Sequence, residues 1–317
     1  TTLPDNIEFA VTASIDGFEG EKSAPYIYRK QNYNNAFFEF NFEKSVLTPN
    51  NYCAKFSWPM DLDGNGEFDA LLVDRLYRGD GTVADPQCTT KSHKLQAYKL
   101  DGTCLWTVDM GSNINISAGQ NDMVVAYDIN CDGKCEVIIK SSDQTRFWDA
   151  ANNTWGKYAK GSSTPDTDGD GISDYTTQKR RNPPFYISVI DGKTGAEIDC
   201  SELNYAEVTD GVDRYSRDNR SSYRDDDDGR DYAFLCGKFA ICYFDGIHPS
   251  LGMECVDRTT DGTHHYYVFA WQYDWAGGTP SNWHHGYTWS RNDKSPWPAD
   301  FHQLRVADVD GDGIEEL

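Results

Sequence analysis

The chain has 317 residues, enough for one large domain or two ordinary ones, and 38% of them are hydrophobic, which suffices for a packed core. Its formal net charge of −22 argues against nucleic acid and anionic membrane surfaces as partners, because both require a basic protein surface. The sequence has no apolar run of about 18 residues and therefore predicts no membrane-spanning helix.

Many short strands are predicted, because the apolar stretches are brief and are separated by Gly, Asp, Asn and Pro. Residues 1–50 are interpreted as an N-terminal β segment, either a small β-domain or an arm used in assembly. Residues 51–317 form a second region, in which predicted strands alternate with a repeated acidic motif.

The acidic motif D-x-[DN]-x-[DN]-G-x-x-[DE] occurs four times, at Asp61–Asp69, Asp128–Glu136, Asp166–Asp174 and Asp308–Glu316. β-Prone apolar residues follow the first two copies, at 70–73 and 137–139, so each of these copies is expected to lead into a buried strand. Asp-Gly pairs between alternating runs then predict hairpins, at residues 101–102, 191–192 and 245–246. Repeats of about four strands are typical of the blades of a β-propeller.

The third copy interrupts this rhythm, because no apolar strand follows it. We interpret residues 149–182, which contain it, as a surface insertion pinned by a cation. The most polar stretch, residues 216–231, has four consecutive Asp at 225–228. It is interpreted as a solvated loop, with a further cation site as the alternative.

The motif has the chemistry of a calcium loop. Oxygen side chains at positions 1, 3, 5 and 9 and the carbonyl of position 7 can surround one hard cation, and the Gly at position 6 permits the sharp turn. An EF-hand is excluded, because that loop needs a Glu at position 12 and flanking helices. The alternative, simple Asp-Gly turns, is weakened by four copies at one internal spacing. The predicted Ca²⁺ ligands are Asp61, Asp63, Asn65, Glu67, Asp69, Asp128, Asn130, Asp132, Lys134, Glu136, Asp166, Asp168, Asp170, Ile172, Asp174, Asp308, Asp310, Asp312, Ile314 and Glu316.

Several features favour a secreted glycoprotein with disulfides. Nine dispersed cysteines without a paired CxxC zinc pattern favour an oxidising compartment. Asn115, Asn152 and Asn219 begin glycosylation sequons, and a chain that starts at Thr1 is consistent with a processed protein. Cys131 and Cys135, both inside the second copy, could form a local disulfide or stay reduced.

An ordered set of segments resembles rhamnogalacturonan lyases of polysaccharide lyase family 11. The matching segments are Pro59–Gly64, Leu95–Thr103, Leu105–Gly111, Val189–Gly195, Phe244–Leu251 and His302–Gly313. The resemblance implies a calcium-rich, eight-bladed β-propeller. This chain would supply a little over half of the blades, and the remaining blades would come from another segment or a completing chain.

The resemblance also implies a chemistry, the β-elimination that cleaves the galacturonate–rhamnose backbone of pectin. In such a reaction calcium neutralises the uronate carboxylate and a basic side chain removes the C5 proton. Where the family has Asn-Asp and Lys-Trp-Asp beside the first copy, this chain has Lys55-Phe56 and Val73-Asp74-Arg75. Lys55 and Arg75 are therefore candidate substrate-binding residues in a changed groove.

Three further residues are candidates for catalysis, each with a structural alternative. Lys140 matches a family lysine and could instead be a solvated strand end. His302 could be a base, a calcium ligand or a buried hydrogen-bonded histidine, and Arg258 could pair with a carboxylate. The adjacent pairs His264-His265 and His284-His285 disfavour a transition metal, since neighbours on a strand point opposite ways. The aromatic run 266–275 is interpreted as core, with sugar stacking as the alternative.

These observations favour a non-catalytic, calcium-stabilised propeller that engages pectic or other extracellular polysaccharide or assembles outside the cell. The alternative is an active rhamnogalacturonan lyase. A calcium propeller unrelated to lyases is the third interpretation.

Overall fold

The computed structural model describes residues 6–15, 18–29, 52–76, 94–110, 124–142, 145–149, 154–159, 185–203, 237–258, 264–293 and 305–316. These ranges contain eighteen strands and no α-helix, which confirms the predicted all-β class. In the same ranges no helix is long and apolar enough to cross a membrane.

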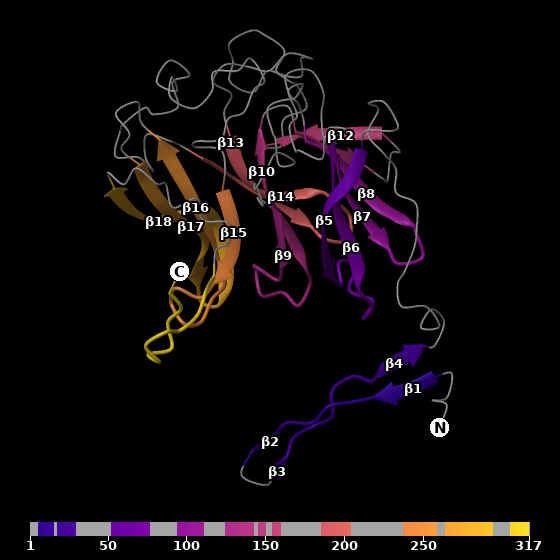
Figure 1. Ribbon diagram of the computed structural model, residues 1–317. Coiled ribbons are helices and arrows are strands. Elements are labelled where there is room, and N and C mark those ends of the chain that lie inside the picture. The colour runs from indigo at the N-terminus through magenta and orange to yellow at the C-terminus, as the bar shows by residue number, and fades with distance from the viewer. Residues whose placement is uncertain are drawn as a thin grey trace.

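Three antiparallel sheets make up most of the described chain (Figure 1). The first has the order β12-β11-β8-β7-β6-β5, formed by β5 (Tyr52–Met60), β6 (Asp69–Leu76), β7 (Lys94–Lys99), β8 (Cys104–Asp109), β11 (Arg146–Asp149) and β12 (Thr154–Tyr158). The second has the order β14-β13-β10-β9, formed by β9 (Val124–Tyr127), β10 (Glu136–Ser142), β13 (Phe185–Asp191) and β14 (Glu197–Glu202). The third has the order β15-β16-β17-β18, formed by β15 (Gly237–Cys242), β16 (Ser250–Arg258), β17 (His264–Ala276) and β18 (Thr279–Asp293).

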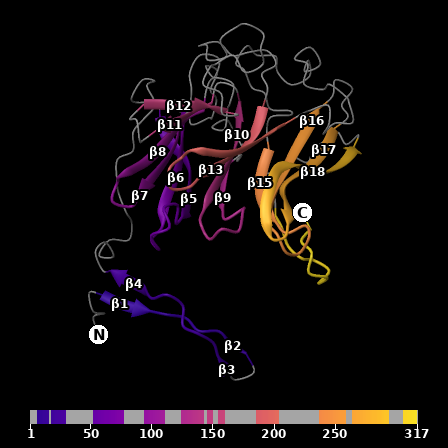
Figure 2. The same cartoon turned by 180° about the vertical axis from the view of Figure 1, so that it is seen from behind.

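The second sheet lies between the other two in both views (Figures 1 and 2). Its edge strand β9 contacts β5 of the first sheet and β15 of the third. The third sheet is also tied to it by the Nε1 of Trp283, which donates to the carbonyl of Ile187 at 3.2 Å. In this central position β10 is buried along its whole length.

One core of buried side chains connects the three sheets. It includes Leu71 and Trp106 from the first sheet, Val137 and Ile190 from the second, and Trp271 from the third, each at most 1% exposed. Burial of one large aliphatic side chain contributes about 1.5–3 kcal/mol to folding. The three sheets are therefore stabilised together rather than as separate units.

The aromatic run contributes to this core, as the sequence predicts. Phe269, Trp271 and Tyr273 of β17 are buried. The ring of Trp271 meets that of Phe269 edge-on, with centroids 6.0 Å apart, and Tyr273 packs against Trp283 of β18 at 5.0 Å. These three side chains are packed inside the protein, which leaves no face of theirs for stacking on a sugar.

The strands predicted around the Asp-Gly pairs are confirmed. Residues 101–102 connect β7 to β8, residues 191–192 lie at the end of β13, and residues 245–246 lie between β15 and β16. The sequence does not predict β11 and β12. After β10 the chain returns to the first sheet, where β11 pairs with β8 and β12 pairs with β11. β12 lies inside the predicted insertion of residues 149–182, so the sheet extends to residue 158.

The N-terminal strands form two small sheets of their own. β1 (Asn6–Phe9) pairs with β4 (Tyr26–Arg29), and β2 (Ser14–Ile15) pairs with β3 (Phe18–Glu19). Both views show this ribbon apart from the three larger sheets (Figures 1 and 2). The interpretation of residues 1–50 as one small β-domain or as an assembly arm stays a prediction.

Candidate metal centre

Three copies of the acidic motif are described, and all are hairpin loops of one register. We name them loop 1 (Asp61–Asp69), loop 2 (Asp128–Glu136) and loop 4 (Asp308–Glu316). In each, the residue before position 1 pairs with position 9, as Met60 with Asp69, Tyr127 with Glu136 and Ala307 with Glu316. The third copy, with Asp166, Asp168, Asp170, Ile172 and Asp174, lies outside the described residues.

The carboxylate at position 1 anchors the turn. In loop 1, Asp61 accepts hydrogen bonds from the backbone N–H of Asn65 at 3.0 Å and of Gly66 at 2.7 Å. Asp128 and Asp308 accept the equivalent pairs of bonds at 3.0–3.1 Å in loops 2 and 4. The backbone is therefore folded so that the position 1 carboxylate faces the inside of each loop.

Positions 3, 5 and 9 complete the pattern. The side chain at position 3 accepts from the N–H of position 5, and the side chain at position 5 accepts from the N–H of position 7, in all three loops. The carboxylate at position 9 accepts from the N–H of position 2, at 2.9 Å in loop 1, 3.2 Å in loop 2 and 2.9 Å in loop 4. The predicted oxygen ligands thus converge from both ends of each loop.

Two residues of each loop have positive φ, at positions 4 and 6. The angles are +72° and +84° for Gly64 and Gly66, and +81° and +91° for Gly311 and Gly313. In loop 2 position 4 is Cys131, with φ +57°, while Gly133 has φ +84°. The motif itself requires glycine only at position 6. In the other three copies position 4 is also glycine. This is the sequence signal from which a second residue with left-handed backbone could have been predicted.

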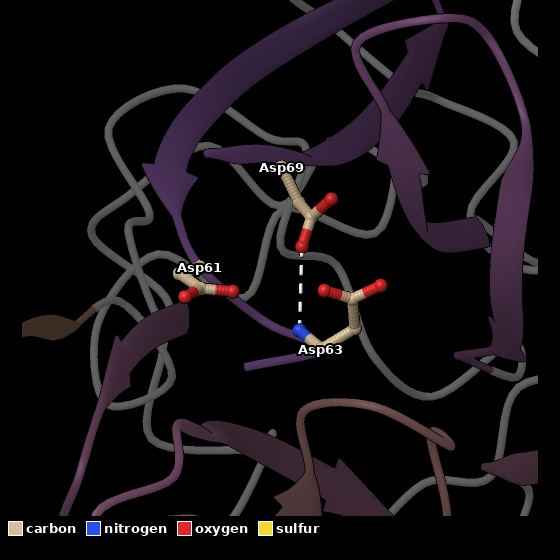
Figure 3. Close-up of side chains that lie close together, drawn as sticks. All are labelled: Asp61, Asp63 and Asp69. Atoms are coloured by element: carbon tan, nitrogen blue, oxygen red, sulfur yellow. Dashed lines mark hydrogen bonds between the residues drawn. The ribbon is translucent and has the colours of Figure 1, made fainter. Parts of the chain in front are cut away.

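The carboxylates of loops 1 and 4 are close enough to share a cation. One oxygen each from Asp61, Asp63 and Asp69 lie within 4.8 Å of one another, and the same holds for Asp308, Asp310 and Glu316. Figure 3 shows the three carboxyl groups of loop 1 around a common space, with Asp69 also bonded to the N–H of Asp63. These oxygen ligands fit a hard cation such as calcium.

Burial and like charge make these carboxylates costly without a cation. Burial raises the pKa of Asp69, and the charges of Asp63 and Asp61 add to the effect. Burial, together with the charges of Asp132 and Asp128, raises the pKa of Glu136 to about 7. A bound divalent cation would favour the ionised form of both groups.

The Asp-Gly turn after β13 holds loops 1 and 2 together. The N–H of Gly192 donates to the carbonyl of Cys135 at 2.9 Å, and the Nε1 of Trp106 donates to the carbonyl of Gly192 at 2.7 Å. A Cβ added at Gly192 would lie 2.2 Å from the Cys135 oxygen and 3.0 Å from the Leu62 oxygen. The turn is therefore packed between the backbones of both loops.

The Asp-Gly turn after β15 meets loop 4 in a similar way. A Cβ added at Gly246 would lie 2.7 Å from the carbonyl oxygen of Gly313. The N–H of Tyr243 donates to Glu315 at 2.8 Å, and the hydroxyl of Tyr243 lies 2.8 Å from that of Tyr127. The start of loop 2 and the end of loop 4 are thus linked through one tyrosine.

Four of the other site candidates lie wholly or partly outside the described residues. This applies to the side chains of Lys55, Arg75 and Arg258 and to all of His302. The backbone places Lys55 at a bulge between Ala54 and Phe56, and Arg75 is paired with Cys53 on the neighbouring strand. Lys55 and Arg75 therefore lie near each other on adjacent strands.

Lys140 is buried in β10, at 2% exposure. It pairs with Ile187 of β13, so it lies within the second sheet rather than at its margin. The alternative of a solvated strand end is therefore wrong.

The histidine and cysteine candidates do not form joint sites among the described side chains. His284 contacts Asp274 at 2.9 Å, whereas His285 lies edge-on to Trp271. Cys131 is exposed and Cys135 is buried, and both thiols are free, so the local disulfide considered from the sequence is not formed. Burial, with the charge of Glu136, raises the pKa of Cys135 to about 12, which makes it a poor nucleophile.

The fold and loops define an all-β protein with repeated acidic hairpin loops. The chain belongs to rhamnogalacturonan lyase family 11, because the model of that family's C-terminal domain matches residues 47–317. This confirms the resemblance drawn from the sequence.

Two curated relatives from Bacillus subtilis (strain 168) are similar over most of the chain. Rhamnogalacturonan endolyase YesW is 30% identical over 262 residues, covering 81% of this chain and 36% of the relative. Rhamnogalacturonan exolyase YesX is 29% identical over 275 residues, covering 85% of this chain and 38% of the relative. The aligned part of the chain thus spans little more than a third of the length of these relatives.

A solved structure shares the fold. The Bacillus licheniformis rhamnogalacturonan lyase PL11 superposes with a TM-score of 0.58 at 24% identity, covering 97% of this chain and 47% of the other.

Proposed function

We propose that this chain is part of a secreted, calcium-stabilised β-propeller that binds the rhamnogalacturonan backbone of pectin with little or no turnover of its own. The observation that carries the proposal is the family match over residues 47–317, which spans all four copies of the acidic motif. Calcium, the propeller and secretion are parts of this proposal.

The arrangement of the sheets supports the propeller. β5, β9 and β15 each lie at one edge of their own sheet, and β9 contacts both of the others. In a propeller, the inner strands of neighbouring blades would meet in this way, at the edges of successive sheets. A completing segment or chain, and self-assembly, stay predictions.

Calcium would be held by the carboxylate and amide oxygens of loops 1, 2 and 4 and would supply charge neutralisation there. The loops' own backbone N–H groups already orient these oxygens inward. A folded loop therefore needs little rearrangement before it binds a cation. Net charge also bears on the substrate, because a chain of −22 repels an acidic polymer unless cations or local basic groups intervene.

Lys55 and Arg75 are the basic groups that we propose for uronate binding. Their strands pair through Cys53 and Arg75, and Lys55 is the extra residue of the β5 bulge. Bulges often redirect a side chain near a binding site.

Binding and turnover are tested with one preparation. Rhamnogalacturonan I oligosaccharides are titrated into the purified chain in calcium, and the ultraviolet absorbance of the unsaturated product is followed in parallel. We expect binding without product, and weaker binding by about tenfold in Lys55→Ala or Arg75→Ala. Lys193→Ala, at an exposed lysine on the turn after β13, is the matched control. Unchanged binding in both groove variants would contradict the proposed site.

An active lyase is the second candidate, favoured by the similarity to an endolyase and an exolyase. β-Elimination would need a base at the C5 proton of galacturonate, with the C4–oxygen bond breaking as the double bond forms. His302 stays a candidate base and Arg258 a candidate partner for the uronate carboxylate, and Lys140 is a weaker candidate because it is buried. Release of unsaturated galacturonate by the purified chain would establish this candidate and overturn the non-catalytic one.

A further inference from the structure

A lysine of the neighbouring strand contacts a carboxylate of loop 1. The Nζ of Lys99 lies 2.7 Å from the Oδ2 of Asp63, with the lysine side chain 37% exposed and the aspartate 9%. Lys99 comes from β7, where it is paired directly with Asp69, the position 9 residue of the loop. Sheet register therefore places a positive charge beside two of the three clustered carboxylates of loop 1.

Loop 2 has the opposite charge at the equivalent place. The residue paired with Glu136 on the neighbouring strand is Asp191, and its carboxylate accepts bonds from the N–H and the hydroxyl of Thr194 at 2.7 Å. Lys134 contacts Asp132 at 3.3 Å, but its side chain is 69% exposed. A surface pair of this kind contributes little, because solvent screens it.

The ion pair affects both partners in the direction expected of a partial counter-ion. Burial disfavours the ionised form of Asp63, but the hydrogen bond and charge of Lys99 outweigh burial and lower the pKa of Asp63. The hydrogen bond and charge of Asp63 raise the pKa of Lys99. At 2.7 Å from the Oδ2 of Asp63, the ammonium of Lys99 supplies at loop 1 part of the neutralisation that a divalent cation would supply.

We propose that Lys99 is a tethered cation of loop 1, which holds Asp63 when calcium is scarce and competes with calcium for that carboxylate. The inference rests on the proposed calcium role of the loops. It follows that loop 1 binds calcium more weakly than it would without Lys99, and that it depends less on calcium for its folded state. The repulsion between the ammonium and a divalent cation at one carboxylate is the physical cause.

The test uses the full chain with Lys99→Met, which keeps most of the side-chain length and removes the charge. Lys99→Arg keeps the charge, and Lys193→Met makes the same charge change at an exposed site. Thermal unfolding is followed in EGTA and at saturating calcium, and calcium binding is measured by calorimetry after EGTA treatment. Of the three variants, we expect only K99M to have a lower Tm than the wild-type chain in EGTA. Its Tm should return to the wild-type value at saturating calcium.

In calorimetry we expect one calcium site of K99M to be about ten times tighter than in the wild-type chain. Adding Asp63→Asn to K99M should abolish that gain. Equal calcium affinities in wild type and K99M would overturn the inference while leaving the calcium proposal intact. A K99M chain that stays unfolded at saturating calcium would also overturn it, because calcium could not then replace the lysine. If neither chain binds calcium, the proposed calcium role itself fails.

Discussion

Position 4 of loop 2 is occupied by a residue poorly suited to its backbone. Cys131 has a φ of +57°, whereas Gly64 and Gly311 fill the same position in loops 1 and 4. A side chain in the left-handed region costs about 1–2 kcal/mol relative to the right-handed one. The thiol is exposed and free, so no disulfide at this position offsets that cost.

Replacing Cys131 with glycine should therefore stabilise the protein. We expect Cys131→Gly to raise the free energy of unfolding by about 1 kcal/mol, measured by thermal denaturation in reducing buffer. Cys131→Ala removes the thiol and keeps the Cβ, so it should give no such gain. Equal gains in both variants would show that the thiol, not the backbone, is responsible.

At the scale of elements, the turns after β13 and β15 contact acidic loops that belong to other hairpins of the chain. The turn at Gly192 contacts the backbones of loops 1 and 2, and the turn at Gly246 contacts loop 4. From the sequence, these Asp-Gly pairs are hairpin signals only. Their second role as packing surfaces could not be predicted, because it depends on segments far apart in the chain.

A side chain at Gly192 should disrupt this junction. In Gly192→Ala the new Cβ would meet the Cys135 carbonyl, which is backbone and cannot rotate away. We expect a loss of about 3 kcal/mol in the free energy of unfolding, measured by urea denaturation. Gly278→Ala is the control, because Gly278 has a φ of +81° but nothing within 4 Å of an added Cβ. Its cost should be about 1 kcal/mol, from the backbone alone. Equal costs at both sites would argue against a packed junction.

The parts of the fold that can be predicted from the sequence are the local ones. The strands after loops 1 and 2 follow from β-prone residues next to a recognisable turn, and the ligand oxygens follow from the spacing of Asp, Asn and Glu. β11 and β12 escape prediction because they extend an earlier sheet, to which the chain returns after β10. The role of Lys99 cannot be predicted from the sequence either, because its contact with Asp63 depends on the register between two strands.

At the scale of the whole molecule, charge is the dominant feature. The net charge of −22 includes buried carboxylates at position 9 of loops 1 and 2, Asp69 and Glu136, each 2% exposed. The pKa of Glu136 is raised to about 7, above its unfolded value, so its ionised form destabilises the calcium-free protein at neutral pH. Cations bound only by the folded state would offset this cost.

Chelation should therefore lower Tm substantially. A site at a hundredfold excess of calcium over Kd stabilises the folded state by about 2.7 kcal/mol. Unfolding followed by circular dichroism in EGTA and in calcium measures the difference. Glu136→Gln should raise Tm in EGTA and lower it in calcium, because it removes both a buried charge and a ligand. The exposed Glu21→Gln should change neither value. An EGTA curve identical to the calcium curve would contradict the structural role of calcium.

The contact between Trp106 and Gly192 spans 86 residues of the chain. During synthesis, the indole of the first sheet has no such partner until residue 192 has emerged. Long-range contacts of this kind form slowly, since a large loop must close before they do. The first hairpins can form early, but the junction between loops 1 and 2 must wait for β13. Chaperones would therefore encounter the first sheet before the indole of Trp106 has its hydrogen-bond partner, and the two loops would become rigid together rather than one after the other.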